Sequence, residues 1–405
     1  MFVLLIGTLD TKATETAFVR ERLKRAGLAV RVLDAGVLGT PGFEADIKRE
    51  ELFRVAGTSL SKVREMADRG HAVTLASLGA ARIAEQLNAT GELGGVFGLG
   101  GSAGTTIATA AMRVLPYGVP KVMVSTLASG QVSHYVGIRD IAMFHSVVDI
   151  SGLNRISRTV LGNASAAFAG MVQNRDEVQA LANIDLKPLI TATMFGVTTP
   201  CVEVGRKHLE ASGFEVLVFH ATGTGGRTME ALIREGMISG VFDATTTELA
   251  DELVGGILTA GRDRMTAASL RGVPQVISVG AMDMVNFGPR ETVPAKFMDR
   301  KFHQHNASVT LMRTTPEEND KLGREIAEKA SASQGPTAVV LPLRGVSAID
   351  REGQSFWWPE ADQALFESIQ NWMSPHVKIV ELDLHINDPE FAKAMAETLL
   401  KLMRR

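Results

Sequence analysis

The sequence has few of the features that mark secreted, membrane or nucleic-acid-binding proteins. A single cysteine, Cys201, among 405 residues excludes an intramolecular disulfide framework and fits a reducing compartment. No apolar stretch is as long as a membrane span, and residues 1–7 lack the basic region and the length of a signal peptide. A net charge of −3 gives no overall basic field to attract nucleic acid. These absences predict a cytoplasmic protein whose partners include neither membrane nor nucleic acid.

Several familiar active-site motifs are also missing. No G-x-x-x-x-G-K-[ST] occurs, which argues against an ordinary P-loop enzyme. The glycine-rich stretch at residues 98–106 is not spaced G-x-G-x-x-G, and no acid follows about 20 residues later, so a dinucleotide fold is poorly supported. Nucleophile elbows, HExxH and CxxC pairs are absent. Cys201 follows a proline at a predicted helix start, and without a base beside it we interpret it as a packing residue.

The pattern that is present alternates short apolar runs with longer amphipathic segments. This is typical of βαβ units around a parallel sheet, and 405 residues suffice for two or three domains. In the first half we expect strands at 2–6, 29–33, 72–76, 95–97, 121–125 and 143–147, and helices at 13–25, 60–69, 80–88, 105–114 and 157–172. Near the C-terminus we expect a helix at 361–373, a strand at 377–382 and a helix at 389–403.

The second half repeats landmarks of the first in the same order. The matched pairs are the turns after Gly7 and Gly196, the glycines Gly27 and Gly213, the triplets 95–97 and 240–242, and the Gly-Val-Pro triplets at 118–120 and 272–274. We therefore predict an α/β protein with two Rossmann-like lobes, parallel sheets and a cleft between them. Residues 1–183 form the nucleotide-binding lobe, with an insertion at 36–78, and residues 184–405 form the C-terminal lobe.

The most informative motif is the loop at residues 98–106, between a predicted strand and a predicted helix. Glycines let the backbone turn sharply and approach a ligand, and the amides of the helix start carry a partial positive charge. We predict that this loop binds phosphate, and the alternative is a tight turn without a ligand. The candidate residues are Gly100, Gly101, Ser102, Gly104, Thr105 and Thr106.

A second group of candidates follows the first two strands. Thr8, Thr11 and Lys12 can meet phosphate, and Asp10 can hold Mg²⁺ directly or through water. The alternative is that Thr11 only caps the helix, with Glu15 near a capping-box position. Asp34, at the end of the second strand, stands where an acid commonly takes a ribose hydroxyl, and it could equally be a turn residue.

The C-terminal lobe offers another glycine-rich turn. We predict an anionic second ligand there, with Arg227 gripping a carboxylate or phosphate. The residues assigned to this second-ligand site are Thr222, Gly223, Thr224, Gly225, Gly226, Arg227 and Asp243.

Titratable residues of the same lobe are candidates for catalysis. His220, Asp283, His303 and His305 could serve as acids or bases. His303 and His305 are two apart on a predicted strand, so they would point the same way and could suit a metal, although a structural histidine pair is favoured.

Five segments together resemble a known family. They are GTLDTK at 7–12, GLGGSAGTT at 98–106, TMFGVT at 193–198, FHATGTGG at 219–226 and HQHN at 303–306. The chain resembles, over nearly all its length, an uncharacterised bacterial and fungal family related to the ATP-binding N-terminal domain of a plant protein. That plant protein confers tobamovirus resistance by inhibiting viral RNA replication, an activity we do not carry over. The resemblance implies a two-lobed Rossmann-like fold, ATP with Mg²⁺ in the N-terminal lobe, and a homodimer.

Three hypotheses for function follow. The leading one is an ATP-binding protein whose N-lobe binds Mg-ATP and whose C-lobe glycine-rich loops bind an anionic small molecule, which would allow an ATP-using reaction. An alternative is a non-catalytic ATP-binding regulatory or interaction module. Another alternative is a metal-dependent hydrolase or lyase acting on a phosphorylated or carboxylated substrate.

Overall fold

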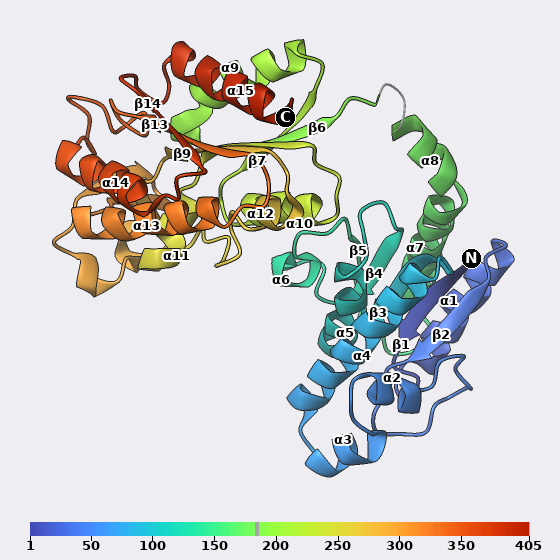
Figure 1. The fold of residues 1–405 in the computed structure, drawn as a ribbon. Helices are drawn as coiled ribbons and strands as arrows, with labels where there is room; N and C mark the ends of the chain where they lie inside the picture. The colour runs from blue at the N-terminus through green and yellow to red at the C-terminus, as the bar shows by residue number, and fades with distance from the viewer. Residues whose placement is uncertain (183–185, 405) are drawn as a thin grey trace. The chain divides into compact units, whose positions relative to one another are not determined.

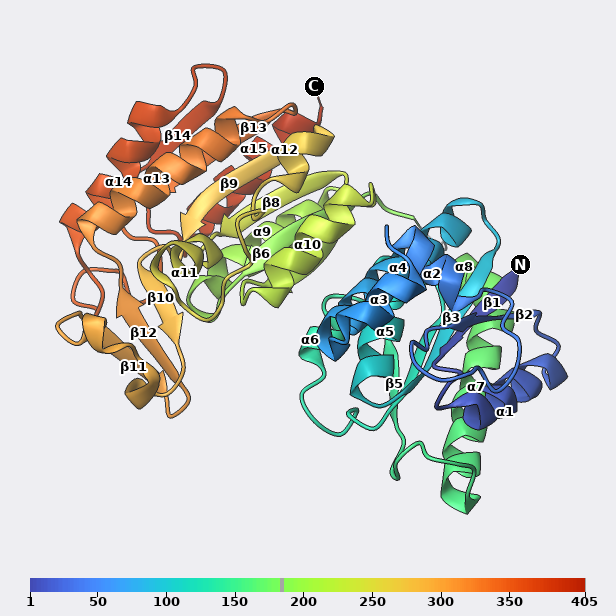
Figure 2. The same cartoon turned by 90° about the horizontal axis from the view of Figure 1, so that it is seen from below.

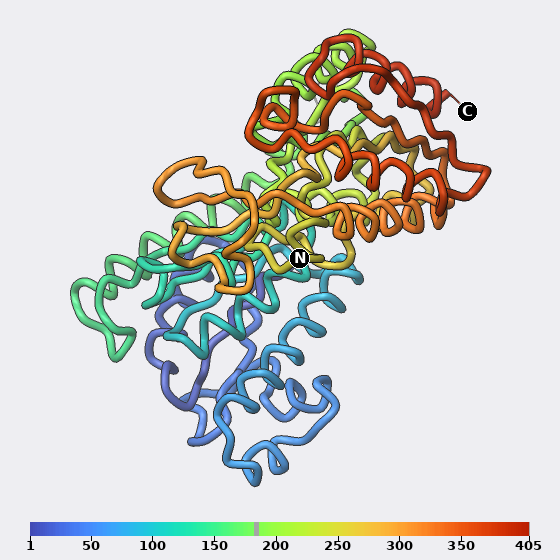
Figure 3. Tube along the Cα trace, turned by 90° about the vertical axis from the view of Figure 1, so that its left-hand side faces the viewer, coloured from blue at the N-terminus to red at the C-terminus, as the bar shows by residue number. Residues whose placement is uncertain are grey.

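The computed structural model describes residues 1–182 and 186–404, so the boundary predicted between residues 183 and 184 lies outside the described residues. The chain divides into two compact units, Met1–Asp185 and Leu186–Arg405. In Figure 3 the N-terminal unit runs from blue to green and the C-terminal unit from yellow-green to red. Within the described ranges, every helix is too short or too polar to cross a lipid bilayer.

The N-terminal unit is built on a five-stranded parallel sheet (Figure 1). Its strands are β1 (Phe2–Gly7), β2 (Val30–Asp34), β3 (Leu93–Gly100), β4 (Lys121–Ser125) and β5 (Ala142–His145). Its helices are α1 (Ala13–Arg25), α2 (Arg49–Val55), α3 (Leu60–Met66), α4 (Arg69–Ala89), α5 (Ser102–Arg113), α6 (Ser133–Val136), α7 (Arg155–Gln173) and α8 (Arg175–Ala182).

The C-terminal unit contains a six-stranded parallel sheet and a separate three-stranded antiparallel one (Figure 2). Its strands are β6 (Leu189–Met194), β7 (Glu215–His220), β8 (Gly240–Thr245), β9 (Gln275–Gly280), β10 (Met284–Phe287), β11 (Phe302–Asn306), β12 (Val309–Arg313), β13 (Thr337–Pro342) and β14 (Lys378–Leu382). Its helices are α9 (Thr199–Ala211), α10 (Thr224–Arg234), α11 (Glu248–Val254), α12 (Ala267–Arg271), α13 (Pro316–Ser331), α14 (Pro359–Trp372) and α15 (Pro389–Met403), with short 3₁₀ turns at Gly196–Thr198, Arg290–Thr292 and Ala295–Phe297.

The two large sheets share one strand order. The first runs β2-β1-β3-β4-β5, and the second runs β7-β6-β8-β9-β13 before adding β14 at its edge. This is the doubly wound order in which ligands bind at the point where the order reverses. The predicted repeat is confirmed at this level, and the matched glycines behave alike: Gly27 and Gly213 both have left-handed φ values, of +83° and +94°.

Helices cover both faces of each sheet, as the apolar pattern requires. On the first sheet, α1 and α7 pack on one face, and α4 and α5 pack on the other. On the second sheet, α9 and α15 pack together on one face, while α13 lies beside α14 on the other (Figure 2).

One predicted strand is wrong. Residues 72–76 lie within α4, a continuous helix of 21 residues. Ala72, Ala76, Ala80 and Ala84 are buried at intervals of four, which places them on one face of a helix. Because alanine has the highest helix propensity and the buried positions follow the helical period, the run is a helix against the sheet rather than a strand within it.

Candidate functional site

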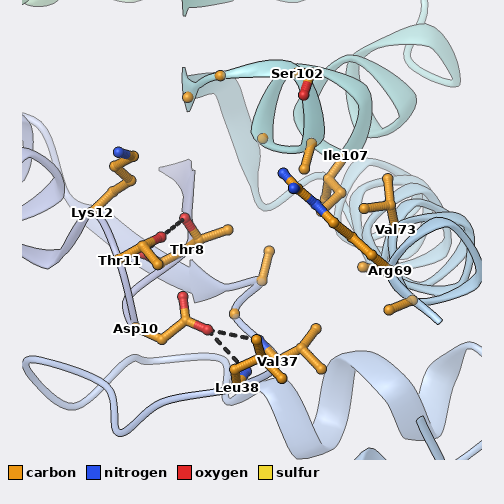
Figure 4. A pocket seen from close by; sticks show the side chains of 18 of the residues that line it. Thr8, Asp10, Thr11, Lys12, Val37, Leu38, Arg69, Val73, Ser102 and Ile107 are labelled. Atoms are coloured by element: carbon orange, nitrogen blue, oxygen red, sulfur yellow. Dashed lines mark hydrogen bonds between the residues drawn. The ribbon is translucent and has the colours of Figure 1, made fainter. Parts of the chain in front are cut away.

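The N-terminal unit contains a pocket of about 700 Å³ at the carboxyl edge of its sheet. It lies where β1 and β3 are neighbours and the connections leave in opposite directions, the usual ligand position for this strand order. Figure 4 shows its walls. Polar and charged lining residues are Thr8, Asp10, Thr11, Lys12, Arg64, Asp68, Arg69, Ser102 and Asp149, and apolar ones include Val37, Leu38, Val63, Val73 and Ile107.

The glycine loop forms the part of the wall next to α5. Gly101 is the N-cap of α5 and has no side chain to cover the first amides of the helix. A Cβ on Gly100 would lie 2.9 Å from the Cα of Gly104, so the strand end and the first helical turn approach more closely than other residues allow. The start of α5 therefore opens into the pocket with its partial positive charge.

The hydroxyls of the loop divide into two groups. Ser102 is exposed and lines the pocket. Thr105 is buried, and its hydroxyl bonds to the Gly101 carbonyl and to the Ser125 hydroxyl. Thr106 donates its hydroxyl to the Ser102 carbonyl. Thr105 and Thr106 therefore act on the backbone of α5, and Ser102 is the hydroxyl that faces the pocket.

The turn after β1 forms the facing wall. The Thr8 and Thr11 hydroxyls are 2.8 Å apart, and the amides of Thr11 and Lys12 both donate to the Thr8 carbonyl. Lys12, rather than Thr11, is the N-cap of α1. Glu15 is buried and accepts a hydrogen bond from the Gly152 amide, so it ties α1 to a distant loop. The capping-box interpretation of Thr11 and Glu15 is therefore wrong.

Asp10 and Arg64 hold the loop that follows β2. Asp10 Oδ2 accepts hydrogen bonds from the amides of Val37 and Leu38, both at 3.0 Å (Figure 4). Arg64 donates to the carbonyls of the same two residues, at 2.6 and 3.0 Å. This leaves Asp10 Oδ1 as the oxygen with which Asp10 could meet a cation.

Asp34 lies behind the pocket wall rather than in it. It is buried, and its Oδ1 accepts hydrogen bonds from the amides of Leu9 and Gly36. Burial raises the pKa of Asp34, although these amides and Arg49, 3.8 Å away, oppose the rise. Asp34 thus positions the two loops that carry Thr8 and Val37, and its carboxylate is already bonded within the fold.

In the C-terminal unit, an internal carboxylate occupies the glycine-rich turn. Glu248 Oε1 accepts hydrogen bonds from the Gly223 and Gly226 amides, at 2.7 and 3.1 Å. Arg227, in the first turn of α10, donates a hydrogen bond to the Gly223 carbonyl. Because Glu248 is fully buried, the amides expected to meet an external anion are bonded to a carboxylate of the same chain.

Asp243 belongs to the same buried cluster. It forms two hydrogen bonds with Arg264, which also bonds Glu248 and lies 3.7 Å from Glu230. Burial would lower the pKa of Arg264, but the three carboxylates raise it overall. Burial also raises the pKa of Glu230. One guanidinium therefore links β8, α10 and α11.

The four catalytic candidates lie in different surroundings. His220 is exposed at the end of β7 and stacks on Phe195, with ring centroids 5.4 Å apart. Asp283 is fully buried and accepts a hydrogen bond from Ser347, and burial, followed by the neighbouring Asp350, raises its pKa to about 7.

His303 and His305 both lie on β11, as predicted, but differ in environment. His303 bonds Ser355 through Nδ1 at 3.1 Å, whereas His305 falls at a register shift between Gln304 and Asn306 and is exposed. Across residues 1–182 and 186–404, no three His, Cys, Asp or Glu side chains gather to hold a metal ion. Cys201 is buried, and burial raises the pKa of its thiol to about 12, in keeping with a packing residue.

Comparison with known proteins decides the family. Residues 1–177 match the N-terminal domain of Uncharacterised protein family (UPF0261), and residues 187–403 match its C-terminal domain. The chain belongs to the UPF0261 family. A UPF0261 protein of Clostridium tetani is 49% identical over 405 residues, covering all of this chain and 99% of its own.

Plant relatives are similar along the same length. The ToMV susceptible protein tm-1(GCR26) and the ToMV resistance protein Tm-1(GCR237) of Solanum lycopersicum are each 41% identical over 418 residues. The match covers 99% of this chain and 55% of each tomato protein. The expected resemblance is thereby confirmed.

Within the UPF0261 fold, sequence reasoning missed one side of the N-terminal pocket. Arg64, Arg69 and Val73 come from α3 and α4, in the segment predicted as an insertion. Figure 4 shows the Arg69 side chain extending toward Ile107 and Ser102 at the start of α5. The expected helix 60–69 is wrong as a single element, because the chain turns at Ala67, where φ is +51°, and Arg64 and Arg69 belong to α3 and α4. The basic residues of this segment were the available signal, but nothing local indicated that α4 packs beside α5.

Proposed function

We propose that the N-terminal unit binds ATP with Mg²⁺ in the pocket between β1 and β3. The observation that carries this proposal is the meeting, in one cavity of about 700 Å³, of an open helix start, basic side chains and an apolar wall. A phosphate chain and a planar base need these two kinds of surface side by side. The sequence resembles a family related to the ATP-binding N-terminal domain of a plant protein. The similarity to the tomato relatives agrees with that resemblance and supports the choice of ATP as the nucleotide.

Each end of the nucleotide has a matching wall. The phosphates would lie against the first amides of α5, with Lys12 and Arg69 offsetting their charge. The base would pack against the apolar side chains of α3, α4 and α5, among them Val63, Val73 and Ile107. Magnesium usually keeps several waters and binds substrate phosphates with one or two carboxylates, so Asp10 Oδ1 fits a water-mediated ligand.

A glycine substitution tests this placement by calorimetry of Mg-ATP binding. A Cβ on Gly101 would meet one atom within 4 Å, Thr126 Oγ1 at 3.7 Å, so the Cβ of the Gly101→Val variant makes no clash with the fold. The valine side chain should block the phosphates. The affinity for ATP should fall at least about tenfold, which is about 1.4 kcal/mol of binding free energy. Gly162→Ala on α7, where a Cβ meets open space, is the matched control. Unchanged ATP affinity in Gly101→Val would refute the proposal.

A further inference from the structure

The C-terminal unit contains a second cavity, of about 800 Å³, away from its glycine-rich turn. It lies at the carboxyl ends of the parallel strands β13 and β14, lined by the loops that follow Pro342 and Leu382 and by the first turn of α14. Ligands of open α/β sheets bind at this edge. A cavity of this size accommodates a small organic molecule.

Buried and hydrogen-bonded side chains line the base of this cavity. Asp362 is buried and bonds Arg313 at 2.6 Å. His385 is buried, with Nε2 2.9 Å from the Ser347 carbonyl and Nδ1 accepting the Asn387 amide. That second bond requires an unprotonated Nδ1, so the imidazole is neutral, and burial lowers its pKa.

The loop after β13 has a shape that only glycine permits. Gly345 has a φ of +119°, and a Cβ there would collide with the Asp350 carbonyl oxygen and lie 3.0 Å from His385 Cδ2. This tight turn lets Arg344 and Arg351, from the same loop, line one cavity.

Both arginines now hold aspartates of the same chain. Arg344 makes two hydrogen bonds to Asp383, at 2.6 and 2.7 Å, and Arg351 bonds Asp388 at 3.2 Å. The Arg344 and Asp383 side chains are 64% and 73% exposed, and exposed pairs of this kind contribute little to stability. A ligand carboxylate or phosphate could replace Asp383 at low cost and gain the same bidentate geometry with Arg344, while Arg351 adds a second positive charge.

Trp357 adds a flat apolar surface to the same cavity. Its side chain is 43% exposed, while the nearby Phe356 is fully buried and anchors the loop. An exposed tryptophan beside arginines suits a planar group that carries an anionic substituent.

We propose that this cavity is a ligand site for a small organic anion, with Arg344 and Arg351 binding its carboxylate or phosphate and Trp357 stacking on its planar part. None of the described residues that line this cavity lines the pocket of the N-terminal unit, which is built from residues of that unit.

The test uses phenyl phosphate as the probe and the tryptophan fluorescence of the full chain as the readout. All three tryptophans, Trp357, Trp358 and Trp372, belong to the C-terminal unit, so probe bound in the N-terminal pocket does not report directly. We expect saturable quenching by phenyl phosphate and a much weaker response to phenol, which lacks the charge. The Arg344→Gln/Arg351→Gln double variant should lose at least about tenfold in affinity, because both ion-pair partners of the probe are removed.

The control is Arg206→Gln, which removes a partly exposed arginine paired with Glu203 and Glu210 on α9. It should bind the probe as the parent does, and the melting temperature of each variant checks that it folds. The proposal is overturned if quenching does not saturate by about 10 mM probe, or if the double variant binds as tightly as the parent. Gly101→Val should leave probe binding unchanged, so the failure of one site is distinguished from the failure of the other.

Discussion

Arg264 is fully buried and faces Asp243, Glu248 and Glu230, so one positive charge balances three acids. Hydrogen bonds complete the cluster: Glu248 takes the amides of the glycine turn, and Glu230 takes those of Met265 and Ala267. Buried ion pairs add little stability compared with a hydrophobic replacement of both partners. Removing one partner, however, leaves the other charge buried without compensation, which is strongly destabilising.

Removing the guanidinium should therefore destabilise the protein strongly. For Arg264→Met we expect a loss of about 3–5 kcal/mol in the free energy of unfolding, measured by urea denaturation. Arg262→Met is the control, because the Arg262 side chain is 93% exposed two residues away. A loss below about 1 kcal/mol in Arg264→Met would show that the cluster is not held by this charge.

Asp251 gives a prediction for pH. It is fully buried, takes two hydrogen bonds from Asn286, and burial raises its pKa to about 7. The pKa of Asp251 in the folded protein lies above its value near 4 in the unfolded chain, so the folded state holds the proton more tightly. The contribution of Asp251 to the free energy of unfolding is therefore complete below about pH 4 and is lost as the pH rises toward 7. Over three pH units this amounts to at most about 4 kcal/mol.

The Asp251→Asn variant removes this titration. Its free energy of unfolding should fall less than that of the parent between pH 5 and pH 8, as measured by urea denaturation at each pH. Asp299→Asn, at an exposed position, should follow the parent. Identical pH dependence in Asp251→Asn and the parent would contradict the assignment.

Among the elements, α4 links the pocket to the core. Its residues Arg69 and Ala76 line the pocket, while Ala80 is buried in the core of the unit. Gly79 lets α2 approach α4, since a Cβ there would collide with the Leu52 carbonyl oxygen. The small residues of α4 thus set how closely the inserted helices fold over the glycine loop.

Gly79→Ala should accordingly lower the melting temperature despite the higher helix propensity of alanine. We expect a net destabilisation of about 1–3 kcal/mol, because the backbone of α2 must move to relieve the contact. Gly170→Ala on α7, where a Cβ would meet open space, should be neutral or stabilising by up to about 1 kcal/mol. Equal effects at both glycines would rule out close helix packing as the cause.

At the scale of the whole molecule, two units share one strand order but differ at the edge where ligands bind. In the N-terminal unit the start of α5 opens into a pocket. In the C-terminal unit Glu248 accepts hydrogen bonds from the amides of the turn at the start of α10. One topology therefore carries an open helix start in one unit and a closed turn in the other.

Hydrogen exchange of the full chain can show which of these two turns is protected by Mg-ATP. With Mg-ATP at about a hundred times its Kd, amides that exchange by opening the N-terminal unit should slow roughly a hundredfold. Residues 98–113 and 8–12 should show this protection, whereas residues 222–227 should exchange as without ATP. Strong protection of residues 222–227 would instead mean that the nucleotide reaches the C-terminal turn.

Local sequence patterns were enough to predict the class of fold and the position of the glycine loop. Each of the patterns used is visible within a window of about 20 residues. These patterns are the apolar runs of strand length, the helical periodicity and the glycines of each turn. The helices at 13–25 and 389–403 and the strand at 121–125 begin and end where they were predicted. The run at 72–76 was misassigned because a short apolar segment fits a strand and a buried helix equally well.

Which polar groups remain open to a ligand depends on contacts between elements that are distant in the sequence. Asp34 ends β2 and Lys12 follows β1 of the same sheet, yet Asp34 bonds loop amides behind the wall and Lys12 faces the pocket. The sequence of the turn at Gly223 predicts an open anion site, but Glu248, 25 residues away in sequence, bonds its amide. A buried donor must find a partner, and which partner reaches it depends on packing between distant elements rather than on the local sequence.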